Sequence, residues 1–574
     1  MVPKEKTQDL TVGKNGKPRQ KAWQPKAKTG CITCRIRRVK CDEAKPHCVR
    51  CTSTGRKCDG YTYPGRQSRP WRQMGHSPGS LPLSIAMSGL QLESAEELKA
   101  FDFFQCRSAS ELSGFFDAQF WQFEVLQASH YLPSIRHAVI ALGAMHRKLI
   151  AGDAPVVPDD VCDSSIRFAL SQSNRALQEI FKSPGYSTME DKIHMMTTCI
   201  LFHCLACIQG HQNMAFEHLR SGLRILGEVD KELDRGTADT NRHAVSLSTL
   251  RAMLVNMDVQ ARSILSDKMY RVWEPEPKRQ VGIHHVPFLT FAQARVCFES
   301  TYTEVMGFLA QMDTRSTGTH EAVREIFQKY KRIQCQFLVG SNQLEEFLSQ
   351  LSYPLSKADK NSVIGIRLIH DQVKAVLKIF RHFNSGTFTG VMNWAVEDED
   401  MEVMLDLACQ YLDAPSDLTL PSGATPKDYY TSQADRVYRS GIKATNLAPP
   451  AFSCCSGLLS ALWIVTSRSR NLDLRRRAIG LFMSYPRREG LWDSIFAGRV
   501  AWEQMIMEEE ALEKAATTGV QPVVGEQRGP IVMEWNKIRN ISIRYPGVRT
   551  AEIEFCNVQQ YEVGERGVVR QIAW

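Results

Sequence analysis

The chain has 574 residues, of which 43% are apolar and 23% are charged. This length leaves room for up to about four ordinary domains. The composition excludes a peptide-like, low-complexity or wholly disordered chain. A formal net charge of +9 decides little by itself, because many globular proteins of this size carry a similar surplus.

The positive charge is concentrated near the N-terminus. Residues 1–80 contain 19 Lys and Arg but 5 Asp and Glu, a net charge of +14, whereas the other 494 residues carry a net charge of −5. Such a patch indicates attachment to a polyanion, either nucleic acid or an anionic membrane. Residues 1–30 form a basic tail that we interpret as a nuclear localisation signal, a phosphate-binding arm or an ordinary disordered segment.

Targeting features favour a soluble intracellular protein without a membrane partner. The first residues lack the apolar stretch of a secretory signal. Two long uncharged stretches, residues 193–216 and 444–467, are interrupted by polar residues or by proline and so do not favour membrane spans. In a reducing compartment the 17 cysteines are not expected to form a disulfide framework, so a regular cysteine spacing would point to metal.

Six cysteines follow such a spacing, C-x2-C-x6-C-x6-C-x2-C-x6-C. Two 11-residue units, CITCRIRRVKC and CVRCTSTGRKC, repeat the same gaps, which predicts two similar halves around a common centre. Each half offers three thiolates, fewer than the four ligands of tetrahedral zinc. Six sulfurs complete two zinc sites if the first cysteine of each unit bridges both ions. The ligands are then Cys31, Cys34, Cys41 and Cys48 for one ion and Cys48, Cys51, Cys58 and Cys31 for the other.

Other arrangements of these side chains stay open. A single four-cysteine site with two spare thiols and a disulfide knot are the alternatives, and His47 is a competing ligand beside Cys48. Neither alternative explains the repeated spacing. The segment has few apolar residues, so metal binding must supply its folding free energy, about 10 kcal/mol or more. Without zinc, we expect it to be unfolded.

The basic residues of the first half indicate DNA binding. Four cations occupy the six positions between the second and third cysteines, whereas the second half has two near its end. Arg37 and Arg38 are predicted to contact bases, because arginine pairs in bidentate fashion with guanine O6 and N7. Phosphate contacts, which carry no sequence information, are predicted for the remaining cations. These are Arg35, Lys40, Arg56 and Lys57.

The six-cysteine pattern, together with Pro46 in the loop between the halves, resembles the fungal Zn2Cys6 binuclear zinc cluster. The resemblance implies two zinc ions and a helix that enters the major groove of double-stranded DNA. It further implies reading of a CGG-like triplet, mainly through Arg38 and backbone carbonyls near Arg37. Many members have lysine where this chain has Arg38.

A linker is predicted at residues 59–92, between the cluster at 31–58 and a large domain at 93–574. Of the 32 residues from Asp59 to Leu90, 14 are Gly, Pro or Ser. No heptad coiled coil is visible there, so binding as a monomer and pairing through the large domain, as a homodimer or heterodimer, both stay open.

The large domain is predicted to be all-α. Ser94 to Glu97 has the pattern of a capping box that starts a helix. Apolar residues recur at helical spacing in several later stretches. Gly210 lies between two of them, which suggests antiparallel helix pairs. Alternation around Pro546 and Gly547 predicts a short β-hairpin at residues 540–556. The helical stripes are Ile135, Val139, Leu142 and Met145; Ala215, Leu219, Leu223 and Leu226; Leu250, Leu254, Met257, Ala261 and Leu265; and Val373, Val376, Leu377 and Phe380.

Four phrases between residues 112 and 494 extend the resemblance. LSGFFDAQFW, IRHAVIALGAMHR, FEHLRSGLRIL and RRRAIGLFMSYPRREGLWDS are similar to the helical regulatory region of fungal zinc-cluster transcription factors with a fungal-specific transcription factor domain. The resemblance implies a nuclear, sequence-specific RNA polymerase II transcription regulator that contacts the transcription machinery, with no catalytic residues.

A DNA-tethered enzyme or a scaffold is the alternative. The sequence contains no dinucleotide or P-loop motif, and His320-Glu321 lacks the second histidine of a zinc-protease motif. Cys204 and Cys207 fall in an apolar helix and are interpreted as buried structural cysteines. GHSPG at residues 75–79 lacks the strand and helix of a nucleophile elbow. The acidic stretch from Glu397 to Leu407 suggests an activation segment or, with more support, an amphipathic helix. Target genes and the sign of regulation are not encoded in these patterns.

Overall fold

The protein is described by a computed structural model that divides into two compact units, Met1–Ala86 and Met87–Trp574. The structure describes residues 31, 33–34, 37, 39–44, 47–58, 92–151, 163–182, 188–236, 244–264, 273, 287–313, 320–351, 354–379, 397–419, 450–454, 457–517, 537–547 and 550–574. The tail at residues 1–30, the linker to residue 91 and the GHSPG phrase lie outside these residues.

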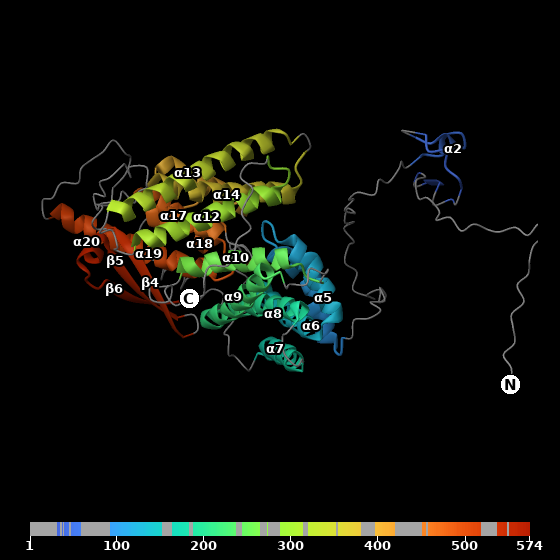
Figure 1. The fold of residues 1–574 in the computed structure, drawn as a ribbon, viewed down its shortest axis with the longest axis horizontal. Coiled ribbons are helices and arrows are strands. Elements are labelled where there is room, and N and C mark those ends of the chain that lie inside the picture. Colours follow the sequence, from blue (N-terminus) through green and yellow to red (C-terminus); the bar gives the residue numbers. More distant parts are fainter. Residues whose placement is uncertain are drawn as a thin grey trace, which may run out of the picture. The chain divides into compact units, whose positions relative to one another are not determined.

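The second unit is mostly helical, as the sequence predicted. Its first half gathers at one end of the unit and the β4–β6 sheet lies at the other (Figure 1). The elements of this half are α3 (Ala95–Phe103), η1 (Phe104–Ser108), α4 (Ala109–Leu112), η2 (Phe120–Glu124), α5 (Val125–Tyr131), α6 (Pro133–Ala151), α7 (Ser164–Phe181), α8 (Met189–Gln209), α9 (Gln212–Asp234) and α10 (Leu247–Ile264), in which η marks a π-helical turn.

Helix ends in this half follow local sequence signals. The Ser94 hydroxyl accepts a hydrogen bond from the Glu97 N–H and so caps α3, while the Glu97 carboxylate accepts from the Glu93 N–H. Thr188 and Asp191 form a complete capping box at the start of α8. Gly210 ends α8 with φ of 81°, a left-handed conformation that glycine adopts without strain, so α8 and α9 form the antiparallel pair that the sequence predicted.

The second half continues with long helices and ends in a small sheet (Figure 1). Its elements are α12 (Phe291–Asp313), α13 (His320–Ser349), α14 (Lys357–Ile379), α15 (Asp398–Leu412), β1 (Ala451–Ser453), α17 (Leu458–Arg468), α18 (Leu472–Ser484), β2 (Arg487–Glu489), β3 (Trp492–Asp493), α19 (Ser494–Thr517), β4 (Ile538–Gly547), β5 (Thr550–Asn557), α20 (Val558–Val563) and β6 (Val568–Ala573).

The helical stripes pack into two large apolar clusters. One cluster is built mainly by α3 to α10 and includes Leu142, Leu219 and Leu254. The other is built mainly by α12 to α18 and includes Val373 and Met404. The stripes are therefore core-facing as predicted, except that Leu265 and Phe380 lie outside the described residues.

Two segments that the sequence left ambiguous are part of this core. Helix α15 carries the acidic stretch, and its Met401, Met404 and Leu405 are fully buried, so the amphipathic-helix interpretation holds. Helix α8 is long and apolar enough to cross a membrane, yet 83% of its apolar window is buried inside the protein. This burial is typical of a core helix.

Two three-stranded sheets complete the second unit. In the first, β1 pairs parallel with β2, which pairs antiparallel with β3. In the second, β4, β5 and β6 are antiparallel neighbours, with Ile543 opposite Ile553 and Ile553 opposite Arg570. The predicted hairpin is thus present and gains a third strand. Strand β6 has one buried residue, Ile572, and such a sequence carries little alternating signal.

Candidate metal centre and nucleic-acid interface

The six cysteines of the first unit bring their sulfur atoms together. Cys31, Cys34, Cys41 and Cys48 form one group and Cys31, Cys48, Cys51 and Cys58 form another, and within each group the sulfur atoms all lie within 4.8 Å of one another. Both groups contain Cys31 and Cys48. This is the division that the repeated spacing predicted.

The sulfur separations match a zinc site. The Sγ atoms of Cys31 and Cys48 lie 3.5 Å apart, those of Cys34 and Cys48 lie 3.7 Å apart, and those of Cys31 and Cys51 lie 3.8 Å apart. Tetrahedral zinc with Zn–S bonds near 2.3 Å requires sulfur atoms about 3.8 Å apart. Disulfide sulfurs would instead lie about 2.0 Å apart, and all six residues are free thiols.

Backbone amides point at these sulfur atoms. The amides of Cys31 and Glu43 each lie 3.4 Å from the Cys41 sulfur. The Cys34 amide lies 3.4 Å from the Cys31 sulfur, and the Cys48 amide lies at the same distance from the Cys58 sulfur. Such N–H donors stabilise thiolates rather than thiols, because they supply positive potential to an anionic acceptor.

Three of the metal-free thiols are held in their protonated form. Burial raises the pKa of the Cys31 thiol to about 12, and it also raises the pKa values of Cys34 and Cys48. A divalent cation offsets this effect, because a coordinating thiol is deprotonated outright. When bound, zinc supplies positive charge and a fixed tetrahedral geometry, and the residues present fit it.

Asp42 joins the two halves of the cluster and was missed by the sequence reasoning. Its carboxylate accepts hydrogen bonds from the amides of Val49 and Arg50 at the start of α2 (Val49–Thr52), at 3.2 and 2.6 Å. A hydrogen bond from the Ala44 amide, together with these two, holds the pKa of the Asp42 carboxyl below its usual range. The sequence did contain a signal, since an aspartate follows each 11-residue unit.

A second contact also links the halves. The Thr33 hydroxyl donates to the Lys57 carbonyl at 3.4 Å. His47, the competing ligand, is exposed and belongs to neither sulfur group. The described residues of the first unit therefore present a donor set made of cysteine alone.

The predicted DNA-contacting residues are only partly described. Lys40, Arg56 and Lys57 have exposed side chains. Arg37 is half-buried, and its Nη1 atom is buried. Arg35 and Arg38 lie outside the described residues. The exposed side chains of Lys40, Arg56 and Lys57, which flank cluster cysteines in the sequence, leave positive charge available to a polyanion.

The cysteines of the second unit that could carry redox or metal chemistry are packed inside its core. Cys204 and Cys207 are buried, and the Cys204 thiol lies 3.6 Å from the Cys454 sulfur. Burial raises the pKa of Cys207 well above its usual value, which keeps that thiol protonated and unreactive. Among the described residues, the two cysteine groups of the first unit are the only clusters suited to a metal ion.

Comparisons with known proteins agree with this centre. Residues 29–68 match the fungal Zn(2)-Cys(6) binuclear cluster domain. The aspercryptin biosynthesis cluster-specific transcription regulator atnN of Emericella nidulans is 27% identical over 587 residues, which cover 89% of this chain and 92% of that protein. No solved structure matches the chain significantly.

Two further relatives match over shorter spans. The transcriptional regulatory protein moc3 of Schizosaccharomyces pombe is 32% identical over 149 residues, covering 21% of this chain and 29% of that protein. The transcription regulator lscL of Purpureocillium lilacinum is 27% identical over 240 residues, covering 39% of this chain and 56% of that protein.

The domain and these relatives define a DNA-binding, non-enzymatic transcription factor built on a binuclear zinc cluster. The chain carries the cluster domain of the fungal Zn(2)-Cys(6) transcription regulators and is similar to one such regulator over most of its length.

Proposed function

We propose that this protein is a nuclear, sequence-specific regulator of RNA polymerase II transcription that reads CGG-like triplets through its zinc-cluster helix. The observation that carries the proposal is the sharing of Cys31 and Cys48 by two four-sulfur groups. Two shared ligands tie both halves of the short segment to the same metal centre. A segment held in this way can present its side chains to the major groove of DNA.

The six cysteines are the proposed zinc ligands. Cys31 and Cys48 bridge the ions, Cys34 and Cys41 complete one site, and Cys51 and Cys58 complete the other. Two Zn²⁺ and six thiolates carry a net charge of −2, so the centre repels DNA unless neighbouring cations compensate it. The surrounding lysines and arginines provide that compensation.

Base reading is assigned to Arg37 and Arg38. The Arg37 amide donates to the Thr33 carbonyl at 3.1 Å, which is a helical i to i−4 bond and places Arg37 at the end of a short helical turn. A side chain at the end of such a turn can reach a guanine edge in the major groove. Phosphate contacts are assigned to Arg35, Lys40, Arg56 and Lys57, which would fix the register of the module on DNA.

The second unit is the proposed regulatory domain. Its helical fold and the likeness to atnN over most of the chain support this role. The acidic stretch forms helix α15, whose apolar side chains are buried. Pairing between two copies would occur through this unit, and contact with the transcription machinery is assigned to it as well. The basic tail at residues 1–30 is the proposed nuclear localisation signal.

Selection of bound sequences from random DNA tests the proposal. We expect enrichment of a CGG-like triplet, with one triplet per site for a monomer and two at fixed spacing for a dimer. Enrichment without any G-rich triplet would contradict the base-reading assignment.

A transcription assay tests the second unit separately. Residues 81–574, fused to a neutral DNA-binding domain, should raise or lower reporter transcription in a fungal host. No change in either direction would favour the scaffold or tethered-enzyme alternative.

A further inference from the structure

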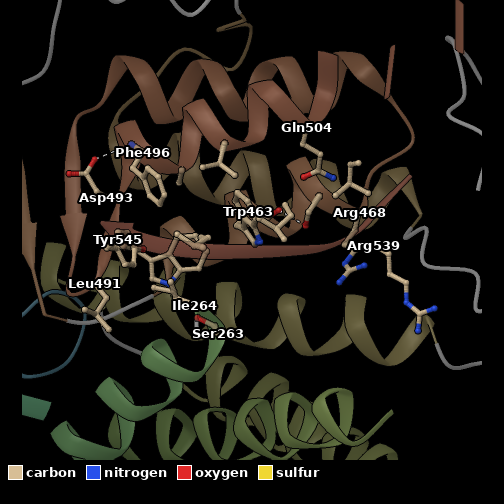
Figure 2. A pocket seen from close by; sticks show the side chains of 17 residues that line it. Ser263, Ile264, Trp463, Arg468, Leu491, Asp493, Phe496, Gln504, Arg539 and Tyr545 are labelled. Atoms are coloured by element: carbon tan, nitrogen blue, oxygen red, sulfur yellow. Dashed lines mark hydrogen bonds between the residues drawn. The ribbon is translucent and has the colours of Figure 1, made fainter. Parts of the chain in front are cut away.

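The second unit contains a cavity that no part of the proposed function uses. It lies between the end of α10, helix α17, strand β3, the first turns of α19 and strand β4 (Figure 2), and has a volume of about 160 Å³. A dry cavity of about 150 Å³ is large enough to hold benzene. The space therefore suits a molecule with a single ring and a short substituent.

Apolar side chains form most of the cavity wall. Phe496 and Val500 belong to α19, Ile541 and Ile543 belong to β4, and Leu491 belongs to the turn between β2 and β3. Figure 2 shows Phe496 and Leu491 at the same end of the cavity. Since apolar surface gains free energy when it leaves water, this wall favours a ligand with an apolar body.

The charged side chains of the lining are engaged within the protein. The Asp493 carboxylate pairs with Arg488 at 2.8 Å and caps α19 through backbone amides. The Arg539 guanidinium lies 4.1 Å from the centre of the Tyr561 ring, and Arg468 also has a partner. Figure 2 shows Arg539 directed away from the cavity. A charged ligand would therefore be buried without a free counter-charge, so the lining favours a neutral one.

The hydrogen-bond donors of the lining fall into two sets. The Ser263 and Ser467 hydroxyls donate to backbone carbonyls at 2.7 Å, and the Gln504 amide donates to a carboxylate within α19. The indole N–H groups of Trp463 and Trp492, in contrast, have no hydrogen-bond partner in the described part of the chain. These two donors are available to a ligand.

Trp463 keeps its indole nitrogen accessible. The nitrogens of Trp121 and Trp502 are buried without a partner among the described residues, whereas the Trp463 nitrogen is not buried. The Trp463 ring packs against apolar residues of α18, α19 and the β4–β6 sheet, and it lies at the middle of the cavity (Figure 2). The accessible edge of the ring is therefore the edge at the cavity. An indole N–H donates and does not accept, so the ligand must bring an acceptor.

The volume, the apolar wall, the paired charges and the accessible donor together define one class of ligand. We propose that the cavity binds a small neutral molecule that has one ring and a carbonyl oxygen, as aromatic ketones do. The ring of the ligand packs between Phe496 and the isoleucines of β4, and its carbonyl oxygen accepts a hydrogen bond from Trp463 Nε1. The Trp492 ring, whose centre lies 5.6 Å from the centre of the Trp463 ring, adds a second aromatic surface there.

Three compounds of similar shape test these features on the full-length, zinc-loaded protein without DNA. Acetophenone has the ring and the carbonyl oxygen, α-methylstyrene has a methylene group in place of that oxygen, and benzoate has a charged carboxylate. Titration calorimetry gives the Kd values. We expect benzoate to bind at least about tenfold more weakly than acetophenone, because its charge must leave water without a counter-charge.

Two variants assign the binding to this cavity. Trp463→Phe keeps an aromatic ring and removes the N–H, so it should weaken acetophenone about tenfold relative to α-methylstyrene. The ratio of the two Kd values is the measure, because the space left by the smaller ring affects both compounds. Val500→Phe places a larger side chain in the cavity wall and should abolish binding of both compounds. Trp502→Phe is the matched control, since Trp502 also has an indole nitrogen without a partner among the described residues but does not line the cavity.

Several outcomes would overturn the proposal. One is a Kd for acetophenone above about 5 mM, and another is benzoate binding as tight as that of acetophenone. An unchanged ratio of Kd values in Trp463→Phe, or an equal change of that ratio in Trp502→Phe, would also overturn it. If Trp463→Phe does not fold, as judged by circular dichroism, the comparison of benzoate with acetophenone and the binding to Val500→Phe still decide.

Discussion

The sulfur atoms of Cys31 and Cys48 lie 3.5 Å apart, although the two residues are 17 positions apart in the chain. Each is the first cysteine of its 11-residue unit, and each belongs to both four-sulfur groups. Every other cysteine of the cluster belongs to one group. Loss of a bridging sulfur should therefore have a different effect from loss of a terminal one.

Zinc content tests this asymmetry. Cys48→Ala leaves both sites with three sulfurs, so we expect tight zinc binding to fall from two ions to none. Cys58→Ala leaves the site of Cys31, Cys34, Cys41 and Cys48 complete, so about one ion should remain. Zinc per chain, measured by atomic absorption after dialysis, distinguishes these results. Cys335→Ala, at an exposed cysteine of the second unit, is the control and should retain two ions. Equal losses in the two cluster variants would argue against bridging.

Metal affinity should fall with decreasing pH. Burial raises the pKa of Cys31 to about 12 and also raises the pKa values of Cys34 and Cys48, so these three thiols are protonated at neutral pH and zinc must displace their protons. Lower pH favours the protonated, metal-free side of this equilibrium. We expect zinc release and loss of DNA binding together as the pH falls from 7.5 toward 5.5. A chromogenic zinc indicator and fluorescence anisotropy of labelled DNA follow the two events, and DNA binding that survives complete zinc release would contradict the prediction.

Arg38 and Lys40 should contribute differently to DNA binding, the first to sequence specificity and the second to overall affinity. Arg38→Ala should weaken binding to a CGG site by about 1–3 kcal/mol and change binding to scrambled DNA less, because a base contact is lost. Lys40→Ala should weaken both equally and reduce the slope of log K against log salt by about one. Anisotropy titrations at several salt concentrations measure both quantities. Arg332→Ala, at an exposed position of the second unit, is the control. Equal losses for Arg38→Ala on the two DNAs would contradict its base-reading role.

Local signals in the sequence were enough to predict the metal centre and several helices of the second unit, among them α3, α6, α9, α10 and α14. The cysteine spacing is short-range, and the capping of α3 by Ser94 involves neighbours in the chain. Asp42, the third strand β6 and the cavity beside Gln504 depend on contacts between distant segments, which periodicity cannot report. The Gln504 environment, for example, is set by Glu508 one turn away and by Arg475 on another helix.

The Arg475–Glu508 pair should be a major determinant of stability in the second unit. The two side chains are each 1% exposed and 2.5 Å apart, and Glu508 also accepts a hydrogen bond from the Ile538 amide at the start of β4. Arg475→Met leaves a buried carboxylate without its cation, which should cost about 3–5 kcal/mol. Denaturant unfolding followed by circular dichroism measures the loss.

A surface pair provides the comparison for Arg475. Arg367 and Glu345 are 3.2 Å apart, with side chains 37% and 64% exposed. Arg367→Met should cost less than about 1 kcal/mol, because solvent screens exposed pairs. If the two arginine variants lost similar stability, burial would not be the cause.

His203 should make the second unit sensitive to mild acid. Its ring is fully buried, its Nδ1 atom donates to the Ala215 carbonyl at 2.9 Å, and burial lowers its pKa from 6.5 to about 4. Between those two pH values the unfolded chain binds a proton that the folded protein does not. The free energy of unfolding therefore falls as the pH falls, by about 2 kcal/mol from this residue between pH 7.5 and pH 5.

Substituting His203 separates its contribution to the pH dependence of the unfolding free energy from the contributions of other titratable groups. His203→Asn keeps an N–H donor near Ala215 and removes the titrating ring, so the difference in unfolding free energy between pH 7.5 and pH 5 should shrink by about 2 kcal/mol. His130→Asn, at an exposed position of α5, should leave that difference unchanged. Urea unfolding of the full chain at the two pH values gives the comparison. A destabilisation by asparagine that is the same at both pH values cancels in this difference. If the difference in His203→Asn equalled that of the unmodified protein, the acid sensitivity would arise from other groups.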